Sequence, residues 1–321
     1  MNTEIRKGEK ICIIMPAFNE ENTIRDVIIN FHNELQSAGI YVIDNNSNDN
    51  TSKIASETFP EINSKNKVGY LIFEKRKGKA NAVKRAFSDI DADIYVMVDT
   101  DSTYPPNELK KLLEPILNNE ADMVVADRQS KGIYRSQNKR RFHVFGNNLV
   151  KNLVNYLYGS ELQDIMSGYR ALNKKFVKNF PSLSEEFEIE TEMTLHALDK
   201  NFRIIEVPIK YRDRPHNSKS KLHTLKDGFK ILKTIFFIFK DYKPLVFFGI
   251  LSGIFFILSA LIGIPVIYEY IQFRYIFKVP SAILATGLMI LSLLFFAIAL
   301  ILDTIVRIQK FNYILKLQNF K

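Results

Sequence analysis

Cysteine is almost absent from this sequence of 321 residues: only Cys12 is present, and it lies in an apolar run. No disulfide framework can therefore form, which agrees with a reducing compartment. The first ten residues are charged and lack a long apolar region, so we expect no signal peptide. No Gly-x-Gly-x-x-Gly motif follows the first apolar run, which argues against a dinucleotide-binding oxidoreductase.

The excess of positive charge is confined to one end of the chain. The net charge is +9, yet residues 1–220 carry 32 Lys and Arg against 31 Asp and Glu, whereas residues 221–321 carry 12 against 4. The basic excess therefore accompanies the apolar C-terminal part. This pattern predicts contact with a membrane surface rather than with nucleic acid.

Short apolar runs alternate with helical patterns between residues 10 and 126. Such alternation predicts an α/β fold with a mostly parallel sheet covered by helices. The expected strands are Lys10–Met15, Ile40–Asp44, Val68–Glu74, Ile94–Val98 and Met123–Ala126. The expected helices cover residues 24–35, 51–59, 80–87 and 107–117. A further apolar stripe at helical spacing over 142–158 fits either a helix on the sheet or contact with lipid.

An acidic pair follows the most apolar of these runs. Ile94–Val98 contains only apolar residues, as strands inside parallel sheets do, and Asp99 and Asp101 come directly after it. In extended backbone, alternate residues lie on one face, about 6–7 Å apart. Two such carboxylates can share one hard divalent cation and leave positions for phosphate oxygens. A solvated acidic turn is the competing interpretation of an isolated Asp-x-Asp.

Polar segments also follow the other strands, at the edge where open α/β sheets bind ligands. Asn19 and Glu20 could present groups to a nucleoside, although Asn19 also suits a helix N-cap. Asp44 is placed to accept from a base N–H or a ribose hydroxyl, within a loop rich in turn-forming residues. The basic loop at 75–82 enters a helix and could approach a diphosphate, with a solvated charge run as the alternative.

Taken in order, these segments resemble a known family. Pro-Ala-Phe-Asn-Glu-Glu at 16–21, the Asp-Asn-Asn-Ser loop from 44, Lys-Gly-Lys-Ala-Asn-Ala at 77–82 and Asp-Thr-Asp at 99–101 are similar to family 2 glycosyltransferases with the GT-A fold. The resemblance implies that Asp99 and Asp101 hold Mg²⁺ or Mn²⁺ on the donor diphosphate. It also implies a nucleotide-sugar site at Pro16, Ala17, Asn19, Glu20, Asp44, Asn46, Lys79, Asp99, Thr100 and Asp101.

The downstream motifs resemble one branch, the polyprenyl-phosphate glycosyltransferases. They include Gln-Asp-Ile-Met-Ser-Gly-Tyr-Arg at 163–170 and Phe-Glu-Ile-Glu-Thr-Glu at 187–192. The resemblance implies that Asp164 orients acceptor or sugar, with a role as base left open. Arg suits phosphate geometry, and the predicted acceptor-phosphate residues are Arg128, Arg140, Arg141, Ser167 and Arg170, with core ion pairing as the alternative for Arg128. Mannose synthases of this branch usually have Gln where this chain has Thr103.

The C-terminal part predicts membrane attachment. Residues 245–268 and 279–302 are each 24 residues without a charge, long enough at 1.5 Å per residue to cross a hydrocarbon core of about 30 Å. A basic amphipathic segment, Leu222–Tyr242, precedes them and suits a membrane interface, with packing on its own domain as the alternative. The basic flanks place both termini and the catalytic domain in the cytoplasm, at the inner membrane of the cell.

The expected organisation is therefore a GT-A catalytic domain at 1–220, an interfacial segment at 221–243, two transmembrane helices within 244–306 and a basic tail at 307–321. The expected function is inverting transfer of a sugar from a nucleotide sugar to a polyprenyl phosphate such as undecaprenyl phosphate, in a homo-oligomer. A UDP-sugar donor is favoured, with GDP-mannose as the alternative. A processive polysaccharide synthase is disfavoured because its Gln-x-x-Arg-Trp motif needs a tryptophan, and a non-catalytic membrane module because the acidic pair is intact.

Overall fold

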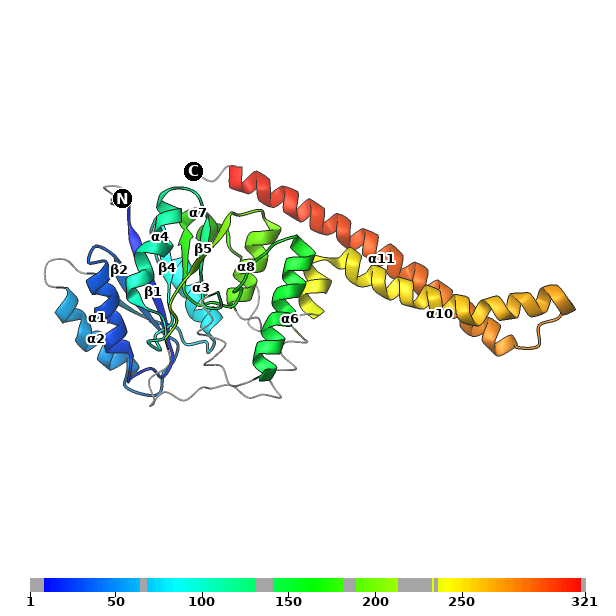
Figure 1. The fold of residues 1–321 in the computed structure, drawn as a ribbon, viewed down its shortest axis with the longest axis horizontal. Coiled ribbons are helices and arrows are strands. Elements are labelled where there is room, and N and C mark those ends of the chain that lie inside the picture. Colours follow the sequence, from blue (N-terminus) through cyan, green and yellow to red (C-terminus); the bar gives the residue numbers. More distant parts are fainter. Residues whose placement is uncertain are drawn as a thin grey trace. The chain divides into compact units, whose positions relative to one another are not determined.

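The structure is a computed structural model that describes residues 9–63, 68–130, 141–181, 189–212, 233 and 236–318, without the side chains of residues 141–145. These residues fall into two compact units, one ending before and one beginning after the segment 213–232. The first unit is built on a seven-stranded sheet in the order β3-β2-β1-β4-β6-β5-β7 (Figure 1). Strand β6 runs antiparallel to both of its neighbours, and the other pairs are parallel.

The strands are β1 (Ile11–Ala17), β2 (Gly39–Asp44), β3 (Gly69–Phe73), β4 (Ile94–Met97), β5 (Met123–Asp127), β6 (Arg170–Asn173) and β7 (Ile204–Pro208). The helices of this unit are α1 (Ile24–Glu34), α2 (Thr51–Ile62), α3 (Lys79–Asp89), the 3-10 turn η1 (Pro106–Glu108), α4 (Leu109–Leu117), α6 (Arg141–Tyr158), α7 (Lys174–Asn179) and α8 (Ile189–Asp199).

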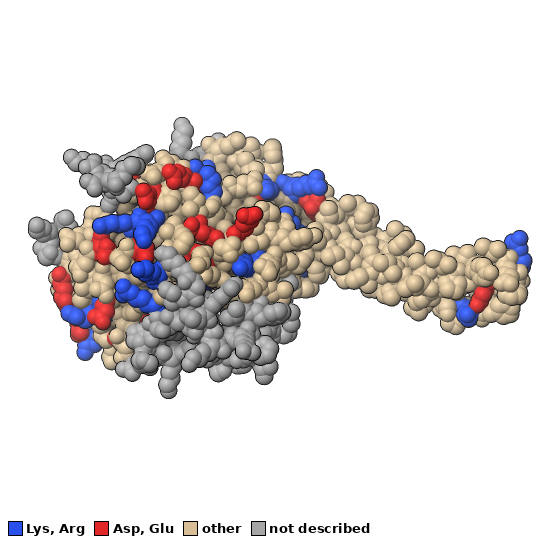
Figure 2. Space-filling view, in the orientation of Figure 1, with Lys and Arg blue, Asp and Glu red and all other residues tan. Residues whose placement is uncertain are grey.

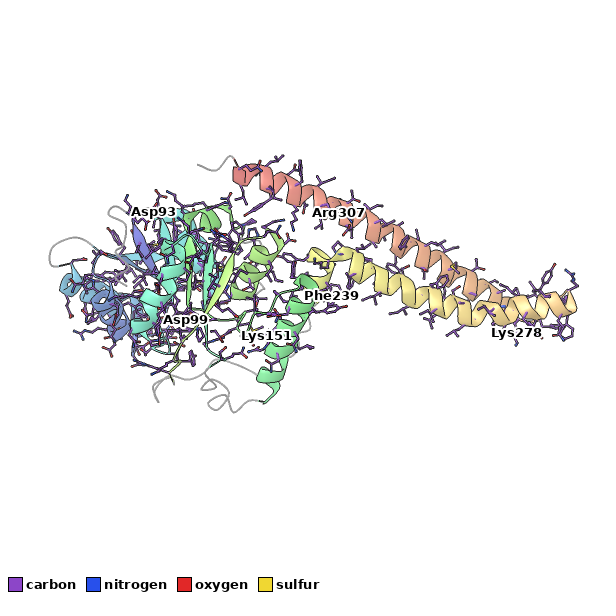
Figure 3. The ribbon with its side chains drawn as sticks, turned by 45° about the horizontal axis from the view of Figure 1, so that its top comes forward. Asp93, Asp99, Lys151, Phe239, Lys278 and Arg307 are labelled. Atoms are coloured by element: carbon purple, nitrogen blue, oxygen red, sulfur yellow. The ribbon has the colours of Figure 1, made fainter. Side chains whose placement is uncertain are left out.

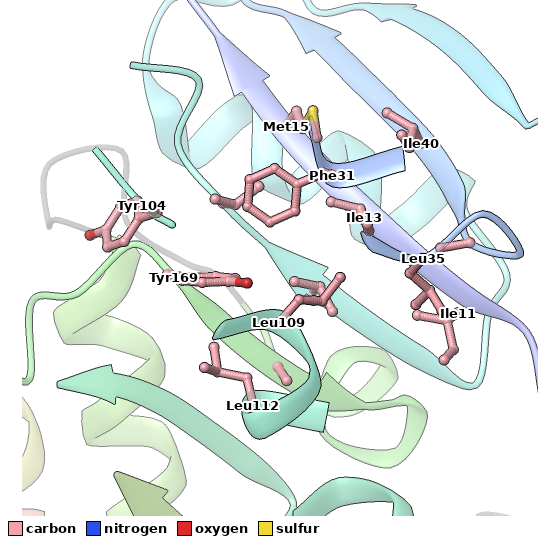
Figure 4. Close-up of a cluster of buried hydrophobic side chains, with 14 of the residues drawn as sticks. Ile11, Ile13, Met15, Phe31, Leu35, Ile40, Tyr104, Leu109, Leu112 and Tyr169 are labelled. Carbon is pink, nitrogen blue, oxygen red and sulfur yellow. The ribbon is translucent and has the colours of Figure 1, made fainter. Parts of the chain in front are cut away.

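Central strands β1 and β4 are buried on both faces because helices cover both sides of the sheet. All seven residues of β1 are buried, and so are all four of β4. One face packs on α1, α2 and α4, where Phe31 and Leu109 meet the alternate residues Ile11, Ile13 and Met15 (Figure 4). The ring of Phe31 meets Tyr169 edge-on at 5.8 Å between centroids. This core holds the carboxyl ends of β1 and β4 at fixed positions.

The five strands and four helices expected between residues 10 and 126 are confirmed, with bounds that differ by a few residues. The expected helix at 107–117 begins with the 3-10 turn η1 at Pro106. The helix expected over 142–158 is α6, and it buries Val150 and Val154 rather than Leu149 and Tyr156, which are 42% and 84% exposed. One face of α6, with Gly146, Val150 and Val154, is therefore buried, and the expected apolar stripe is exposed at Leu149 and half-buried at Leu153 and Leu157.

The second unit is a helical hairpin. Helix α10 spans Pro244–Phe273 and α11 spans Val279–Gln318, and a π-helical turn, η2 (Ile238–Tyr242), precedes them. Both helices are long and apolar enough to cross a membrane, and their apolar side chains face outward. Figure 2 shows the middle of the hairpin almost free of charged side chains, with charges at its tip and, as at Asp303 and Arg307, toward the C-terminal end of α11. Helix α11 continues through the expected basic tail as far as Gln318.

Small polar residues hold the hairpin together. The Ser252 hydroxyl donates to the carbonyl oxygen of Ser292 at 2.9 Å, and the Ser292 hydroxyl donates back to the carbonyl oxygen of Ser252 at 2.9 Å. Ser259 donates to the carbonyl oxygen of Ala285 at 2.8 Å. Such contacts suit helices in lipid, where close backbone approach and interhelical hydrogen bonds replace the hydrophobic effect. Most of the expected amphipathic segment Leu222–Tyr242 lies outside the described residues.

Candidate active site

A cavity of about 470 Å³ opens at the carboxyl ends of β1 and β4. The β1 end supplies Pro16, Ala17, Phe18 and Glu20, the β4 end supplies Asp99, Thr100 and Asp101, and two loops supply Asn45, Lys77, Gly78 and Lys79. Because β1 and β4 are parallel neighbours, their polar continuations meet at one edge of the sheet. Seven of the ten residues predicted for the nucleotide sugar line this cavity.

Hydrogen bonds fix the two strand ends to each other. The Thr23 hydroxyl, at the start of α1, donates to the carbonyl oxygen of Thr100 at 2.6 Å. The Thr100 hydroxyl donates to the carbonyl oxygen of Pro16 at 3.3 Å. The acidic pair is therefore held by the β1–α1 loop as well as by its own strand.

The basic loop that follows β3 is held by Asn45. Its amide nitrogen donates to the carbonyl oxygen of Arg76 at 2.6 Å, and its amide oxygen accepts from the backbone N–H of Gly78 at 2.6 Å. Gly78 has φ +123°, a conformation that favours glycine, and α3 begins immediately afterwards at Lys79. Asn45 thus sets the position from which Lys79 reaches the acidic pair.

The Lys79 ammonium forms ion pairs with Asp99 Oδ1 and with Glu190 Oε1. Burial by itself would lower the pKa of Lys79, but the two carboxylates outweigh it and raise that pKa above its ordinary value, so Lys79 carries a proton. Glu190 comes from the first turn of α8, and its side chain is 9% exposed. Figure 3 shows Asp99 within the sheet unit, and β4 ends at Met97, two residues before it.

Gly168 lies directly against Asp99. A Cβ atom added at Gly168 would lie 2.5 Å from Asp99 Oδ2, so only glycine fits there without displacing the carboxylate. The backbone N–H of Gly168 donates to the Tyr104 hydroxyl at 2.9 Å. The segment between α6 and β6 therefore forms one wall around the acidic pair.

Thr103 orients the second carboxylate. Asp101 Oδ1 accepts from the Thr103 hydroxyl at 2.6 Å and from its backbone N–H at 3.2 Å. Thr103 is 1% exposed. The departure from Gln at this position therefore gives the chain a positioning contact to Asp101.

Three of the predicted donor residues shape the loops rather than the cavity wall. Asn19 Oδ1 accepts from the backbone N–H of Asn48 at 2.8 Å, which ties the β1 loop to the β2 loop. Asp44 is 4% exposed and accepts from the backbone N–H of Ser47 at 3.3 Å. Asn46 is exposed and turns the chain at φ +61°.

Asp164 lies in a buried ion pair. Its Oδ2 accepts from Arg128 Nε at 2.7 Å and its Oδ1 from a terminal guanidinium nitrogen of Arg128 at 2.9 Å. The side chain of Asp164 is 1% exposed and that of Arg128 is 11% exposed. Burial alone would raise the pKa of Asp164, but Arg128 outweighs it and lowers that pKa. A carboxylate with a lowered pKa is a weak base. The structure therefore does not favour Asp164 as the base of the reaction, a role that the sequence had left open. Core ion pairing is the observed state of Arg128.

Arg170, predicted to contact phosphate, bonds to groups inside the domain in the described structure. Its side chain is fully buried, and its guanidinium donates to the carbonyl oxygens of Ser167 at 2.8 Å and Ile165 at 2.7 Å and to the Thr194 hydroxyl at 2.9 Å. Ser167 is also fully buried. Arg170 therefore holds the loop that carries Gly168. Arg140 and the side chain of Arg141 lie outside what the structure describes.

The residues present fit a divalent cation. Asp99 and Asp101 offer hard oxygen ligands, and Asp99 already holds a cation, the Lys79 ammonium. No group of three or more metal-ligating side chains occurs within the described ranges. The chain would therefore supply one or two carboxylates and leave the other positions to water and phosphate, which is how Mg²⁺ is usually bound at phosphate-transfer sites.

Asn45, Gly78, Gly168 and Glu190 contribute to the site but were not among the residues predicted for it. Asn45 and Gly78 belong to the polar segments after β2 and β3, but turn chemistry does not reveal which residue holds a distant loop. Gly168 and Glu190 stand within the 163–170 and 187–192 motifs. Their separation from Asp99 in sequence hides contacts that only the fold creates.

Known proteins resemble this chain in sequence. Residues 12–180 match the family described as Glycosyl transferase family 2. The chain is 30% identical to glycosyltransferase AglJ of Haloferax volcanii over 242 residues, which cover 75% of this chain and 76% of that protein. It is 32% identical over 218 residues to a Methanococcus voltae protein named UDP-N-acetylglucosamine–dolichyl-phosphate N-acetylglucosaminyltransferase, which covers 62% of this chain and 84% of that one.

A solved structure resembles the fold. Glucosyl-3-phosphoglycerate synthase from Mycobacterium tuberculosis, in complex with Mn²⁺, uridine-diphosphate-glucose and glycerol 3-phosphate, aligns with a TM-score of 0.57 at 19% sequence identity. The alignment covers 73% of this chain and 80% of that one. At this identity the likeness concerns the fold alone.

The buried pair of Arg128 and Asp164 predicts a large effect on stability. Asp164→Asn leaves the guanidinium without its counter-charge, and we expect the free energy of unfolding to fall by about 3–5 kcal/mol. The matched control is Asp89→Asn, which breaks the more exposed pair with Arg85 and should cost less than about 1 kcal/mol. The measurement is unfolding of the full chain in detergent, followed by circular dichroism.

The same pair sets a dependence on pH. The pKa of Asp164 is lower in the folded chain, so its contribution is fully present above the unfolded value of about 3.9 and is lost as the pH falls toward the folded value. Asp164→Asn should therefore flatten the loss of stability in acid. Equal stability of the two Asn variants at neutral pH would contradict the structural role of Asp164.

Proposed function

The chain belongs to glycosyltransferase family 2 and has the GT-A fold expected from its sequence, and from this premise we propose that it moves a sugar from a UDP-sugar to a polyprenyl phosphate. The observation that carries this proposal is the meeting of Asp99, Asp101 and Lys79 in one cavity at the end of β1 and β4. Two carboxylates and an ammonium are the groups that a metal-bound diphosphate requires.

The cavity residues have separable roles in the proposed reaction. Asp99 and Asp101 would hold Mg²⁺ or Mn²⁺, and Thr103 keeps Asp101 oriented. A cation held there would supply positive charge for the departing diphosphate. Lys79, at the first turn of α3, adds a positive charge where the helix N-terminus also favours an anion. Pro16, Ala17 and Glu20 form the wall on the β1 side, which we assign to the nucleoside.

The proposed acceptor needs little help from a base. A phosphate monoester has its second pKa near 6, so it already carries an anionic oxygen at neutral pH. The enzyme must then mainly position that oxygen against the anomeric carbon. This agrees with an Asp164 that is committed to Arg128. The inverting outcome implied by the family gives a β-linked lipid-phosphate sugar from an α-linked donor.

Membrane attachment supports a lipid acceptor. Helices α10 and α11 are long and apolar enough to cross a bilayer, and the Methanococcus voltae relative is named as acting on a dolichyl phosphate. That name also supports a UDP-sugar donor. We propose that the catalytic domain and both termini face the cytoplasm of the inner membrane, that the segment before α10 lies at the interface, and that the protein is a homo-oligomer.

The proposed reaction predicts a solvent-extractable product. Purified full-length protein with undecaprenyl phosphate and Mn²⁺ is given labelled UDP-glucose, UDP-N-acetylglucosamine, UDP-galactose or GDP-mannose. We expect one UDP-sugar to label the lipid, and Asp99→Asn to lower the rate by at least about 100-fold because metal stabilisation is worth several kcal/mol. Asp91→Asn, whose side chain is 70% exposed in a pair with Lys174, serves as the control. Transfer that is equal in EDTA would contradict the assigned metal role.

The proposed topology predicts which side of the membrane each end of the hairpin occupies. The native cysteine, Cys12, is 2% exposed, so an added cysteine can be labelled over a low background. Phe277→Cys, in the connector between α10 and α11, should react with an impermeant maleimide added to intact cells. Lys310→Cys, in the charged part of α11, should react only after permeabilisation. The reverse pattern would place the catalytic domain outside the cell.

A further inference from the structure

Lys79 links two carboxylates that come from distant parts of the chain. Its ammonium contacts Asp99 Oδ1 beyond β4 and Glu190 Oε1 in the first turn of α8. The side chain of Asp99 is 29% exposed, whereas that of Glu190 is 9% exposed. The ammonium therefore has one partner on the cavity wall and one partner behind it.

The Lys79 ammonium occupies one oxygen of the Asp99 carboxylate. The Oδ2 of Asp99 faces the backbone of Gly168, where a Cβ would lie only 2.5 Å away, and its Oδ1 is taken by the ammonium. An ammonium and a divalent ion on the same carboxylate repel each other strongly at such short range. A divalent ion that binds Asp99 therefore competes with Lys79.

Glu190 offers the displaced ammonium a place to remain. Lys79 already contacts it, so it can release Asp99 and keep one ion pair. A carboxylate that is 9% exposed would otherwise lose the ammonium that it contacts and keep only the electrostatic interaction with Arg170, which is costly. Glu190 therefore favours retention of Lys79 in the site after the exchange.

We propose that Lys79 is an exchangeable cation: its ammonium occupies Asp99 until a divalent ion binds, and it then moves onto Glu190, from where it can meet the donor diphosphate. Glu190 is the positioning residue for this movement. The inference rests on the proposed function for the identity of the ion, Mg²⁺ or Mn²⁺. It adds to that function a competition between the Lys79 ammonium and the metal ion for the carboxylate of Asp99.

This competition predicts tighter Mn²⁺ binding when Lys79 is removed. The experiment titrates purified full-length protein with Mn²⁺ alone, without nucleotide, and measures free Mn²⁺ by electron paramagnetic resonance. We expect Lys79→Met to bind Mn²⁺ about fivefold more tightly than the native chain, the scale of one ion pair. The matched control is Lys77→Met, which removes the same charge from the same cavity without breaking the pair and should change the affinity by less than twofold.

A double-mutant cycle tests the role of Glu190. Glu190→Gln should weaken Mn²⁺ binding about fivefold while Lys79 is present, because the ammonium then has no second partner. In the Lys79→Met background the same change should matter by less than twofold, since Glu190 acts through Lys79. Equal weakening in both backgrounds would overturn this role and indicate that Glu190 acts on the ion directly.

The exchange itself would be overturned if Lys79→Met bound Mn²⁺ no better than Lys77→Met, or if neither variant bound Mn²⁺ at all. None of these titrations uses a sugar donor or a lipid. Failure of the exchange is thus distinguishable from failure of the proposed transfer reaction, which is measured by label in lipid.

Discussion

The carboxylate of Asp99 is contacted by several distant segments of the catalytic domain. Strand β4 places it beyond a fully buried run, and the ammonium of Lys79 reaches it from α3. Gly168 closes on its other side with no room for a Cβ. The fold thus brings the end of β4, the start of α3 and the segment before β6 together at this carboxylate. The cavity, its proposed metal and its proposed donor all depend on this arrangement.

The fold could be predicted in large part because buried parallel strands appear in sequence as short apolar runs. Ile94–Val98 is such a run, and the polar residues that continue it indicate by themselves where the site lies. Strand β6, Arg170–Asn173, was not predicted because it is only four residues long and begins with an arginine. Its antiparallel pairing between β4 and β5 is a long-range feature that periodicity does not report.

Asp99 and Asp101 were predictable because they come directly after a buried strand, and Lys79 because it lies in the basic loop that enters a helix. All three line the cavity. Arg170 was assigned to a phosphate because arginine suits phosphate geometry, but its donors are used by backbone carbonyls inside the domain. Sequence does not distinguish an arginine that is buried with partners from one that faces a ligand. Glu190 was not assigned to the site because its partner, Lys79, is 111 residues away in the sequence.

The central claim is that this cavity holds a metal-bound nucleotide diphosphate on Asp99. Its most direct measurement is anomalous scattering at the manganese edge from crystals of the full chain grown with Mn²⁺ and UDP. The account predicts a manganese peak in coordination contact with Asp99 and with the diphosphate, and Lys79 paired with Glu190 alone. UDP bound in the cavity with no manganese peak, and with Lys79 still on Asp99, would contradict it.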